Sequence, residues 1–290
     1  MNSPQIGYIS LPLEQPQKSI FEKILTVLDA RMTTPTIFSW YHFLWFAIII
    51  VFCALVVIKC RNLSEKQVLR ILAVTDAVLI ILEIYKQFHA GYNCVEDVWD
   101  YSWSAFPFQF CSTPMYVILA LVLIKNRTVK DALYCFLATY SLFAGIIVLC
   151  NPETVFTETV AVNVQTMIHH GAMIVLGVLL FVSGTVKLEH KTILRAIPVF
   201  AILTTVAFFM NLTFDTFGNP DESFNMFFIA IGEGCPAEIV NELFPNLPYP
   251  VYLCGYLLGF TLASYLVLLV AMACGKLHQK HLRPAELPAE

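Results

Sequence analysis

Charged residues are scarce in this sequence: only 13% of its 290 residues are Asp, Glu, Lys or Arg, whereas 58% are hydrophobic. A soluble globular domain usually carries about 25% charged and about 45–50% apolar residues. The shortage excludes an ordinary water-soluble domain, because its long uncharged segments would face water. The composition predicts a single membrane domain instead.

Several motifs that would indicate other functions are absent. The nine cysteines include no CxxC pair and no zinc-type spacing, and the seven histidines include no clustered HxxxH or HxxHH box. These absences argue against a metal centre and a di-iron desaturase, and we expect no cofactor. The last apolar stretch contains no lysine, which argues against a retinal Schiff base. No internal repeat is apparent, which argues mildly against an inverted-repeat transporter.

Seven apolar stretches are long enough to cross a bilayer, which takes about 20 residues. The second contains Asp76 and Glu83, and the fifth contains two histidines. We therefore predict an all-α, polytopic protein with seven transmembrane helices. The predicted spans lie at 38–58, 67–88, 105–124, 132–150, 161–183, 192–212 and 250–275.

Basic residues are nearly absent from the second, fourth and sixth connections between these spans. The positive-inside rule places the other connections, rich in Lys and Arg, in the cytoplasm. The predicted topology is therefore N-out and C-in, in a plasma membrane if the protein is bacterial or an endomembrane if it is eukaryotic. Of the 17 Lys and Arg residues, the ones that do not lie on the cytoplasmic side are Lys18, Lys23, Arg31 and Lys86.

Three regions make up the predicted domain organisation. Residues 1–37 form an outer segment, and residues 19–32 within it have the helical apolar spacing of an amphipathic helix, which lies on the outer interface or packs on the ends of the bundle. Residues 38–275 form the membrane domain, whose outer connection at 213–249 is apolar enough to fold back as a cap. Residues 276–290 form a cytoplasmic tail. No signal peptide is expected, because the first residues are polar.

Ionisable residues within the spans are functional candidates, because a charge at the bilayer centre costs about 2.5–3.5 kcal/mol on insertion scales. Asp76 and Glu83 lie seven residues apart on one face of the second helix, and Lys86 follows Glu83 by one turn. A Glu–Lys pair would reduce the cost of burying both groups. A structural ion pair explains this arrangement as well as a functional site does.

The third span carries Cys111 near its outer end, three residues before Pro114. We expect this proline to kink the helix and to free the carbonyl of Phe110 beside the thiol. A lone cysteine in a membrane helix is more often a small apolar packing residue.

His169 and His170 lie about eight residues into the fifth span, and a histidine that accepts the thiol proton would create a nucleophile suited to acyl transfer.

The hydrophilic side chains of four spans are expected at a common depth in the outer half of the membrane, with Asp76 deeper. This shared depth predicts an outer-leaflet cavity beneath the cap. The residues at that depth are Glu83, Lys86, Cys111, His169, His170 and Asn211.

Five segments, in the same order along the chain, resemble the YwaF-like family of integral membrane proteins and its animal relative, transmembrane protein 164. The second segment has the family's Pro-then-Cys helix opening, and the fourth has its histidine helix. The segments are ILEIYKQF (81–88), FPFQFCSTPMYVILA (106–120), GIIVLCNPETVF (145–156), QTMIHHGAMIVLGVLLF (165–181) and GCPAEIVNELFPNLPYPVY (234–252).

The resemblance implies an activity, which is the transfer of fatty acyl chains to lyso ether phospholipids through a cysteine nucleophile. By position, Cys111 would be that nucleophile, with His169 or His170 as its partner. Because Cys111 is expected on the outer side, away from cytosolic acyl-CoA, we expect a phospholipid donor and a lysophospholipid acceptor. Gln109 and Ser112 depart from the family, whose members have a histidine two residues before or one residue after the cysteine.

Two other classes of function fit the same residues. The first is a transporter or lipid-handling protein in which Asp76, Glu83 and Lys86 line a path without covalent catalysis. The second is a non-catalytic, receptor-like bundle.

Cys94 and Cys235 both lie in predicted outer loops, where an oxidising compartment would permit a disulfide. The sequence alone leaves these alternatives open.

Overall fold

The structure is a computed structural model that describes residues 18–218, 224–230 and 247–282. It is mainly helical, with one short antiparallel hairpin. The elements are α1 (Ile20–Leu28), α2 (Trp40–Lys59), α3 (Glu65–Gly91), β1 (Tyr92–Asn93), β2 (Val98–Trp99), η1 (Trp103–Ala105), η2 (Phe110–Ser112), α4 (Thr113–Leu123), α5 (Arg127–Phe136), η3 (Leu137–Ser141), α6 (Leu142–Cys150), η4 (Pro152–Thr154), α7 (Val160–Val182), α8 (Lys191–Thr213), η5 (Met226–Phe228) and α10 (Tyr249–Leu282).

Six helical segments among the described residues are long and apolar enough to cross a membrane, which confirms the prediction of a multi-pass membrane protein. The 27-residue helix α3 has the length to be a seventh, but it is less apolar because it carries Asp76, Glu83 and other charged residues. The six segments are Trp40–Lys59, Trp103–Leu123, Arg127–Cys150, Val160–Val182, Lys191–Thr213 and Tyr249–Leu277.

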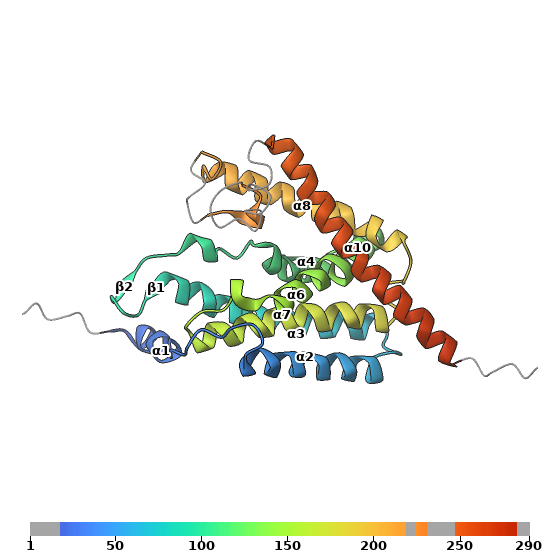
Figure 1. Cartoon of the computed structure of the whole chain (residues 1–290), viewed down its shortest axis with the longest axis horizontal. Coiled ribbons are helices and arrows are strands. Elements are labelled where there is room, and N and C mark those ends of the chain that lie inside the picture. The colour runs from blue at the N-terminus through green and yellow to red at the C-terminus, as the bar shows by residue number, and fades with distance from the viewer. Residues whose placement is uncertain (1–17, 219–223, 231–246, 283–290) are drawn as a thin grey trace, which may run out of the picture.

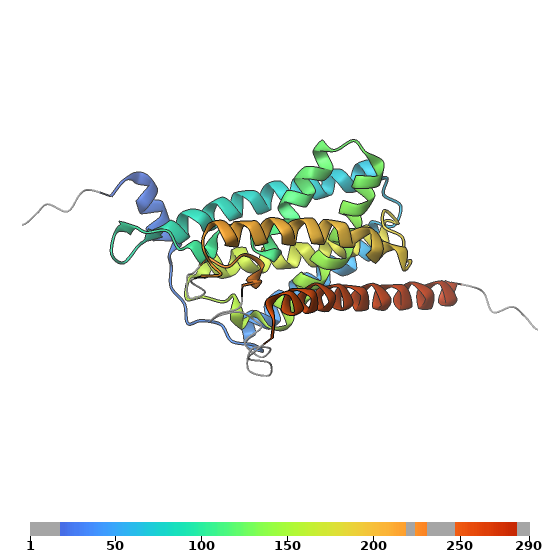
Figure 2. The same ribbon diagram turned by 90° about the horizontal axis from the view of Figure 1, so that it is seen from above.

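Helix α7 lies at the centre of the bundle and contacts α2, α3 and α6 (Figure 1). The remaining long helices pack outside this group, where α5 contacts α8 and α10 contacts α8 and α6. Helix α10 crosses the bundle obliquely in Figure 1, lies along one edge of it in Figure 2, and stays largely uncovered. We call the end of the bundle that carries α1 and the β1–β2 hairpin the hairpin end.

Polar caps define where several helices begin. The hydroxyl of Ser39 accepts a hydrogen bond from the first turn of α2, and Asn126 does the same for α5. Ser64 and Gln67 form a reciprocal capping box at the start of α3. Such caps satisfy backbone N–H groups that have no partner within the helix, and each typically contributes about 1 kcal/mol.

Glycines set the close packing of α6 on α7. A Cβ atom on Gly145 would lie 2.8 Å from the backbone oxygen of His170, and one on Gly177 would lie 2.7 Å from the Cβ of Leu142. Real Cβ atoms do not approach other atoms so closely, so only glycine fits there. Small residues at helix interfaces are typical of membrane bundles, because they let backbones approach. This packing fixes the position of His170 against α6.

The segment that follows α1 ties the hairpin end together. Arg31 forms an isolated bridge with Thr159, and the carboxylate of Asp29 accepts hydrogen bonds from Thr159 and His89. His89 belongs to the last turn of α3, and Thr159 immediately precedes α7. The outer segment therefore joins the ends of the two helices that carry most of the candidate site residues.

Candidate functional site

Cys111 does not lie inside a kinked helix, contrary to the expectation from the sequence. It belongs to the 3-10 turn η2, and α4 begins after it, at Thr113. Pro114 therefore occupies the first turn of α4, where proline is tolerated because the N–H it lacks has no partner within the helix. The carbonyl of Phe110 is not free either, because the hydroxyl of Thr113 donates to it at 2.8 Å.

The turn places Cys111 at the positive end of a helix. Ser112 occupies the N-cap position of α4 without a side-chain capping hydrogen bond. The N-terminus of a helix carries a partial positive charge that favours a nearby anion. The sulfur is within electrostatic range of both Lys86 and Glu83.

His169 reaches the backbone of the same turn. Its Nε2 atom lies 2.9 Å from the carbonyl oxygen of Cys111, and its ring is buried. His170, the next residue on α7, contacts the carbonyl of Thr166 through Nδ1 at 2.8 Å. The centroids of the two imidazole rings are 5.6 Å apart. The structure therefore brings Cys111 and both histidines into one region.

These contacts define the protonation of the two neutral rings. A carbonyl oxygen only accepts hydrogen bonds, so the nitrogen that contacts it carries the proton. Nδ1 of His169 and Nε2 of His170 are then unprotonated and basic. Both are buried and lack a hydrogen-bond partner among the described residues. Buried polar atoms rarely stay unsatisfied, so each such atom suggests a functional group or a missing ligand.

A polar network on α3 borders this region. Glu83 pairs with Lys86 at 2.8 Å and accepts a hydrogen bond from Gln87 at 2.7 Å through the same oxygen. Its other oxygen accepts from Gln165 of α7 at 3.5 Å. Side chains of α3 and α7 therefore meet around a single carboxylate. Lys86 is within electrostatic range of the Cys111 thiol and of both imidazoles.

Gln87 belongs to this network, although the sequence analysis did not select it. Its amide nitrogen also donates to the carbonyl of Ala105 at 2.8 Å, and its amide oxygen accepts from the hydroxyl of Tyr101. These contacts attach α3 to the chain that leads into η2. The sequence feature that could have identified Gln87 is its position four residues after Glu83, on the same helix face.

A family model, that of the TMEM164 family, matches residues 37–271 of the chain. The chain belongs to the TMEM164 family. This match confirms the resemblance to transmembrane protein 164 that the sequence motifs indicated, and it includes all the residues of the site described above. No curated protein and no solved structure matched the chain.

Gln109 and Asn211 do not face Cys111 in this TMEM164-family protein. The amide of Gln109 donates to the carbonyl of Asn225 and accepts from the backbone N–H of Phe227, both at 3.0 Å. The amide of Asn211 pairs with the backbone of Met226 in the same two-way manner. Both side chains therefore hold the segment 224–230, which belongs to the predicted cap, rather than contribute to the site.

The same segment buries aromatic rings against the Cys111 turn. Phe227 is 1% exposed, and its ring centroid lies 5.4 Å from that of Phe110 and 6.0 Å from that of Phe108. Burying one such side chain stabilises a fold by about 1.5–3 kcal/mol. The described part of the predicted cap thus supports the loop that carries Cys111. Cys235, the proposed disulfide partner of Cys94, lies outside the described residues.

Asp76 lies apart from the cluster. Its side chain is 2% exposed, and its Oδ1 atom has no hydrogen-bond partner among the described residues. It is on the same face of α3 as Glu83, about 10 Å deeper at 1.5 Å per residue. Within the described part of the chain, no three His, Cys, Asp or Glu side chains are grouped to hold a metal ion.

Proposed function

We propose that this TMEM164-family protein is a membrane lipid acyltransferase that moves a fatty acyl chain from a phospholipid to a lysophospholipid through a thioester on Cys111. The observation that carries the proposal is the contact between His169 and the Cys111 carbonyl at the start of α4. That contact brings the turn that carries the Cys111 thiol against the helix that carries two imidazoles, each with one nitrogen free to accept a proton. A nucleophile next to a general base is the usual requirement for covalent acyl transfer.

Two features support a thiolate at this position. The uncapped N-terminus of α4 offers partial positive charge immediately after Cys111. Lys86 adds a positive charge from α3, which its partner Glu83 at 2.8 Å partly offsets. The thiol therefore has stabilising groups without a metal ligand and without the histidine that some relatives carry beside their cysteine.

The two histidines take different roles in the proposal. The Nε2–H of His169 is occupied by the Cys111 carbonyl, so this ring positions the turn. Each ring keeps one unprotonated nitrogen without a partner among the described residues, but the His169 ring is fixed on the Cys111 carbonyl, whereas His170 is held by the carbonyl of Thr166 in its own helix. We assign His170 as the general base that accepts the thiol proton.

The reaction then proceeds in two balanced steps. The Cys111 thiolate attacks the ester carbonyl of the donor, a C–S bond forms, and the ester C–O bond breaks. The leaving alkoxide takes the proton from His170 and departs as a lysophospholipid. The hydroxyl of the acceptor lysophospholipid next attacks the thioester and gives its proton to His170. The C–S bond breaks, the acceptor becomes acylated, and the thiolate is restored.

The proposal includes a membrane topology of seven spans, with α3 as the second span, and an N-out, C-in orientation. Its support is the distribution of Lys and Arg along the chain and the length of α3. In this orientation the hairpin end faces the outer side, and Cys111 is reached from the outer leaflet. A phospholipid donor is accessible there, whereas a cytosolic thioester donor is not.

Acyl transfer in reconstituted vesicles tests the proposal. Purified protein receives a phospholipid with an isotope-labelled acyl chain and an unlabelled lysophospholipid, and mass spectrometry follows the labelled product. We expect Cys111→Ala to lower transfer by about 10³-fold or more, since the proposed thioester forms on its sulfur. Cys254→Ala, at an exposed cysteine of α10, is the matched control and should keep its activity. Full transfer by a folded Cys111→Ala protein would rule out the thioester.

One observation supports the alternative function, which is transport. Asp76 is buried on the same helix face as the Glu83–Lys86 pair, and one of its oxygens has no partner among the described residues. An unpaired carboxyl within a bundle is typical of a proton or ion path. The alternative predicts that Asp76→Asn abolishes lipid movement between leaflets while Cys111→Ala leaves it unchanged. The acyltransferase proposal predicts that Cys111→Ala abolishes acyl transfer while Asp76→Asn leaves it unchanged.

A further inference from the structure

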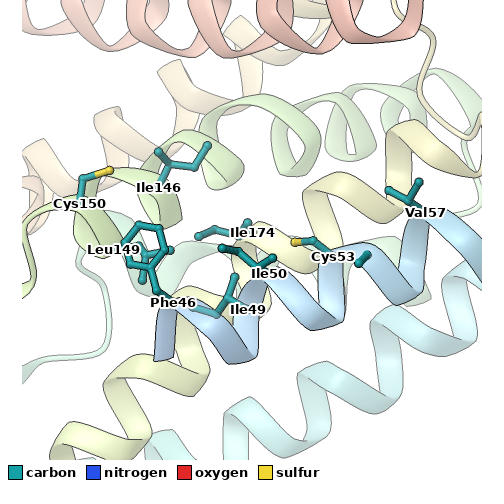
Figure 3. Close-up of a pocket in the computed structure, with 10 residues that line it drawn as sticks. Phe46, Ile49, Ile50, Cys53, Val57, Ile146, Leu149, Cys150 and Ile174 are labelled. Carbon is teal, nitrogen blue, oxygen red and sulfur yellow. The ribbon is translucent and has the colours of Figure 1, made fainter. Parts of the chain in front are cut away.

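An apolar groove lies where α2 and α6 meet α7, and Cys111 is not among the residues that line it (Figure 3). It has a volume of about 500 Å³, within the range of about 300–1,000 Å³ that is typical of ligand sites. Every side chain that lines it is aliphatic, aromatic or a thiol. The lining residues are Phe46, Ile49, Ile50, Cys53, Ala54, Val57, Ile146, Leu149, Cys150 and Ile174.

Packing around α7 creates the groove. Gly171 lets α2 approach α7, since a Cβ atom there would lie 3.0 Å from Cγ1 of Ile49. Ile174 of α7 lies between the side chains of α2 and α6, as Figure 3 shows. The small side chains Cys53 and Ala54 on α2 leave space that larger residues would fill. Two helices thus rest on a third and leave a channel between them.

We propose that this groove holds one acyl chain of a membrane phospholipid. The inference does not depend on acyl transfer, and it goes beyond that proposed function. The lining offers no hydrogen-bonding group for a polar ligand, and a polar group buried there would lose its hydrogen bonds to water at a cost of about 2–7 kcal/mol. The groove also lies between helices that are long and apolar enough to cross the membrane, where hydrocarbon is the surrounding solvent.

The groove is too small to enclose a whole partner helix. Its α2 side extends from Phe46 to Val57, which is about 16 Å at 1.5 Å per residue. A helix with side chains is about 10–12 Å wide, so a segment of that length would fill more than about 1,200 Å³. The available 500 Å³ is less than half of that volume. A single hydrocarbon chain, only about 4–5 Å thick at carbon contact distances of 3.5–4.0 Å, does fit.

In this proposal the polar head group of the lipid lies at the hairpin end. Leu149 and Cys150 form the last turn of α6, and the chain becomes polar immediately afterwards at Asn151 and Glu153. The buried His42 of α2 binds the carbonyl of Leu149 at 2.7 Å and fixes this edge of the groove. An acyl chain that enters here keeps its ester and head group at the hairpin end and its methyl end deeper in the bundle.

Photocrosslinking in nanodiscs tests the site. The probe is a phosphatidylcholine with a diazirine in one acyl chain, and mass spectrometry maps the labelled peptides. We expect saturable labelling of peptides that contain Phe46–Val57 and Ile146–Cys150, which excess unlabelled phosphatidylcholine removes. The uncovered face of α10 serves as the internal reference for lipid that merely surrounds the protein.

Matched substitutions on α2 make the test specific. Ile50→Trp adds an indole ring at a position that lines the groove, whereas Leu55→Trp adds the same ring at a similarly exposed position of α2 that does not line it. Ile50→Trp should lower labelling of Ile146–Cys150 about tenfold, because a filled groove leaves no room for a chain at contact distance. Leu55→Trp should not change it, and Ala54→Phe is the second groove variant if Ile50→Trp does not fold. Equal, non-saturable labelling of the groove and α10, or displacement by a sterol but not by phosphatidylcholine, would overturn the proposal.

Discussion

The Nε2 atom of His169 lies 2.9 Å from the carbonyl oxygen of Cys111, so a side chain of α7 holds the turn that carries the candidate nucleophile. The two residues are 58 positions apart in the sequence. Their contact explains why the turn η2 is ordered at the start of α4 instead of continuing the helix backwards. It also assigns the proton of the neutral His169 ring to Nε2.

The two histidines should differ in their response to an added base. Substituting the proposed general base His170 with Ala is expected to lower acyl transfer by about 10²–10⁴-fold, and added imidazole should restore part of the rate because it can accept the thiol proton. His169→Ala should lower the rate because the Cys111 turn loses its hydrogen bond, and added imidazole should not restore it. Acyl transfer with and without imidazole checks this. Rescue of His169→Ala but not of His170→Ala would reverse the two roles.

Breaking the Glu83–Lys86 pair should destabilise the bundle. Glu83→Gln leaves the Lys86 ammonium without its counter-charge, and Glu83 is 6% exposed. Losing one partner of a buried pair costs about 3–5 kcal/mol, and the partial exposure of Lys86 reduces this to about 2 kcal/mol. The double variant Glu83→Gln with Lys86→Met should regain most of the loss. Thermal unfolding in detergent measures both, and equal stability of wild type and Glu83→Gln would contradict the expectation.

Gly145 and Gly259 provide a matched pair of glycine substitutions. A methyl group at Gly145 meets the backbone oxygen of His170 at 2.8 Å, whereas one at Gly259 meets no atom within 4 Å among the described residues. Gly145→Ala should therefore cost about 1–3 kcal/mol through overpacking and should disturb the His170 backbone. Gly259→Ala should be neutral or stabilising by up to about 1 kcal/mol, since alanine is the better helix former. Unfolding midpoints of the two variants measure these changes in stability.

Gln109 should act on the segment 224–230 more than on the chemistry. Gln109→Leu removes two hydrogen bonds to the backbone of Asn225 and Phe227, which costs about 1–3 kcal/mol locally. Hydrogen exchange of the peptide that contains Phe224–Ala230 should become faster by about tenfold or more, because its closed form loses that stabilisation. Asn211→Leu should give the same signature. Unchanged exchange together with complete loss of acyl transfer would place Gln109 in the reaction instead.

Asp29 should make the hairpin end sensitive to acid. Burial raises the pKa of this carboxyl, but hydrogen bonds from His89 and Arg31 outweigh the burial and hold the pKa below its ordinary value. A lowered pKa in the folded state contributes stability above the unfolded pKa of about 3.9, and this contribution is lost as the pH falls through the lower folded value. Asp29→Asn should therefore destabilise the protein at pH 7 and lose this effect as the pH falls below the lowered folded pKa. Unfolding midpoints across that range measure it, with the exposed Asp100→Asn as the control.

Helical spacing and hydrophobic length predicted most of the fold, because a bilayer imposes them locally. The apolar stretches expected at 161–183 and 192–212 correspond to α7 (Val160–Val182) and α8 (Lys191–Thr213). The predicted helix at 105–124 failed in its first half, where Cys111 lies in a turn. Hydropathy does not distinguish a buried apolar turn from a helix, and Pro114 fits the first turn of a helix as well as a kink.

The sequence by itself determined that this chain is a helical membrane protein. It also predicted that a few polar residues share a depth within the membrane, since depth follows from distance along a helix. Only the tertiary structure decided which of them meet. It set His169 against the Cys111 backbone and Gln165 against Glu83, and it turned Gln109 and Asn211 towards the segment 224–230. The physical reason is rotation: depth depends on helical rise, whereas contact depends on how each helix is turned and how closely glycines such as Gly145 let it approach its neighbours.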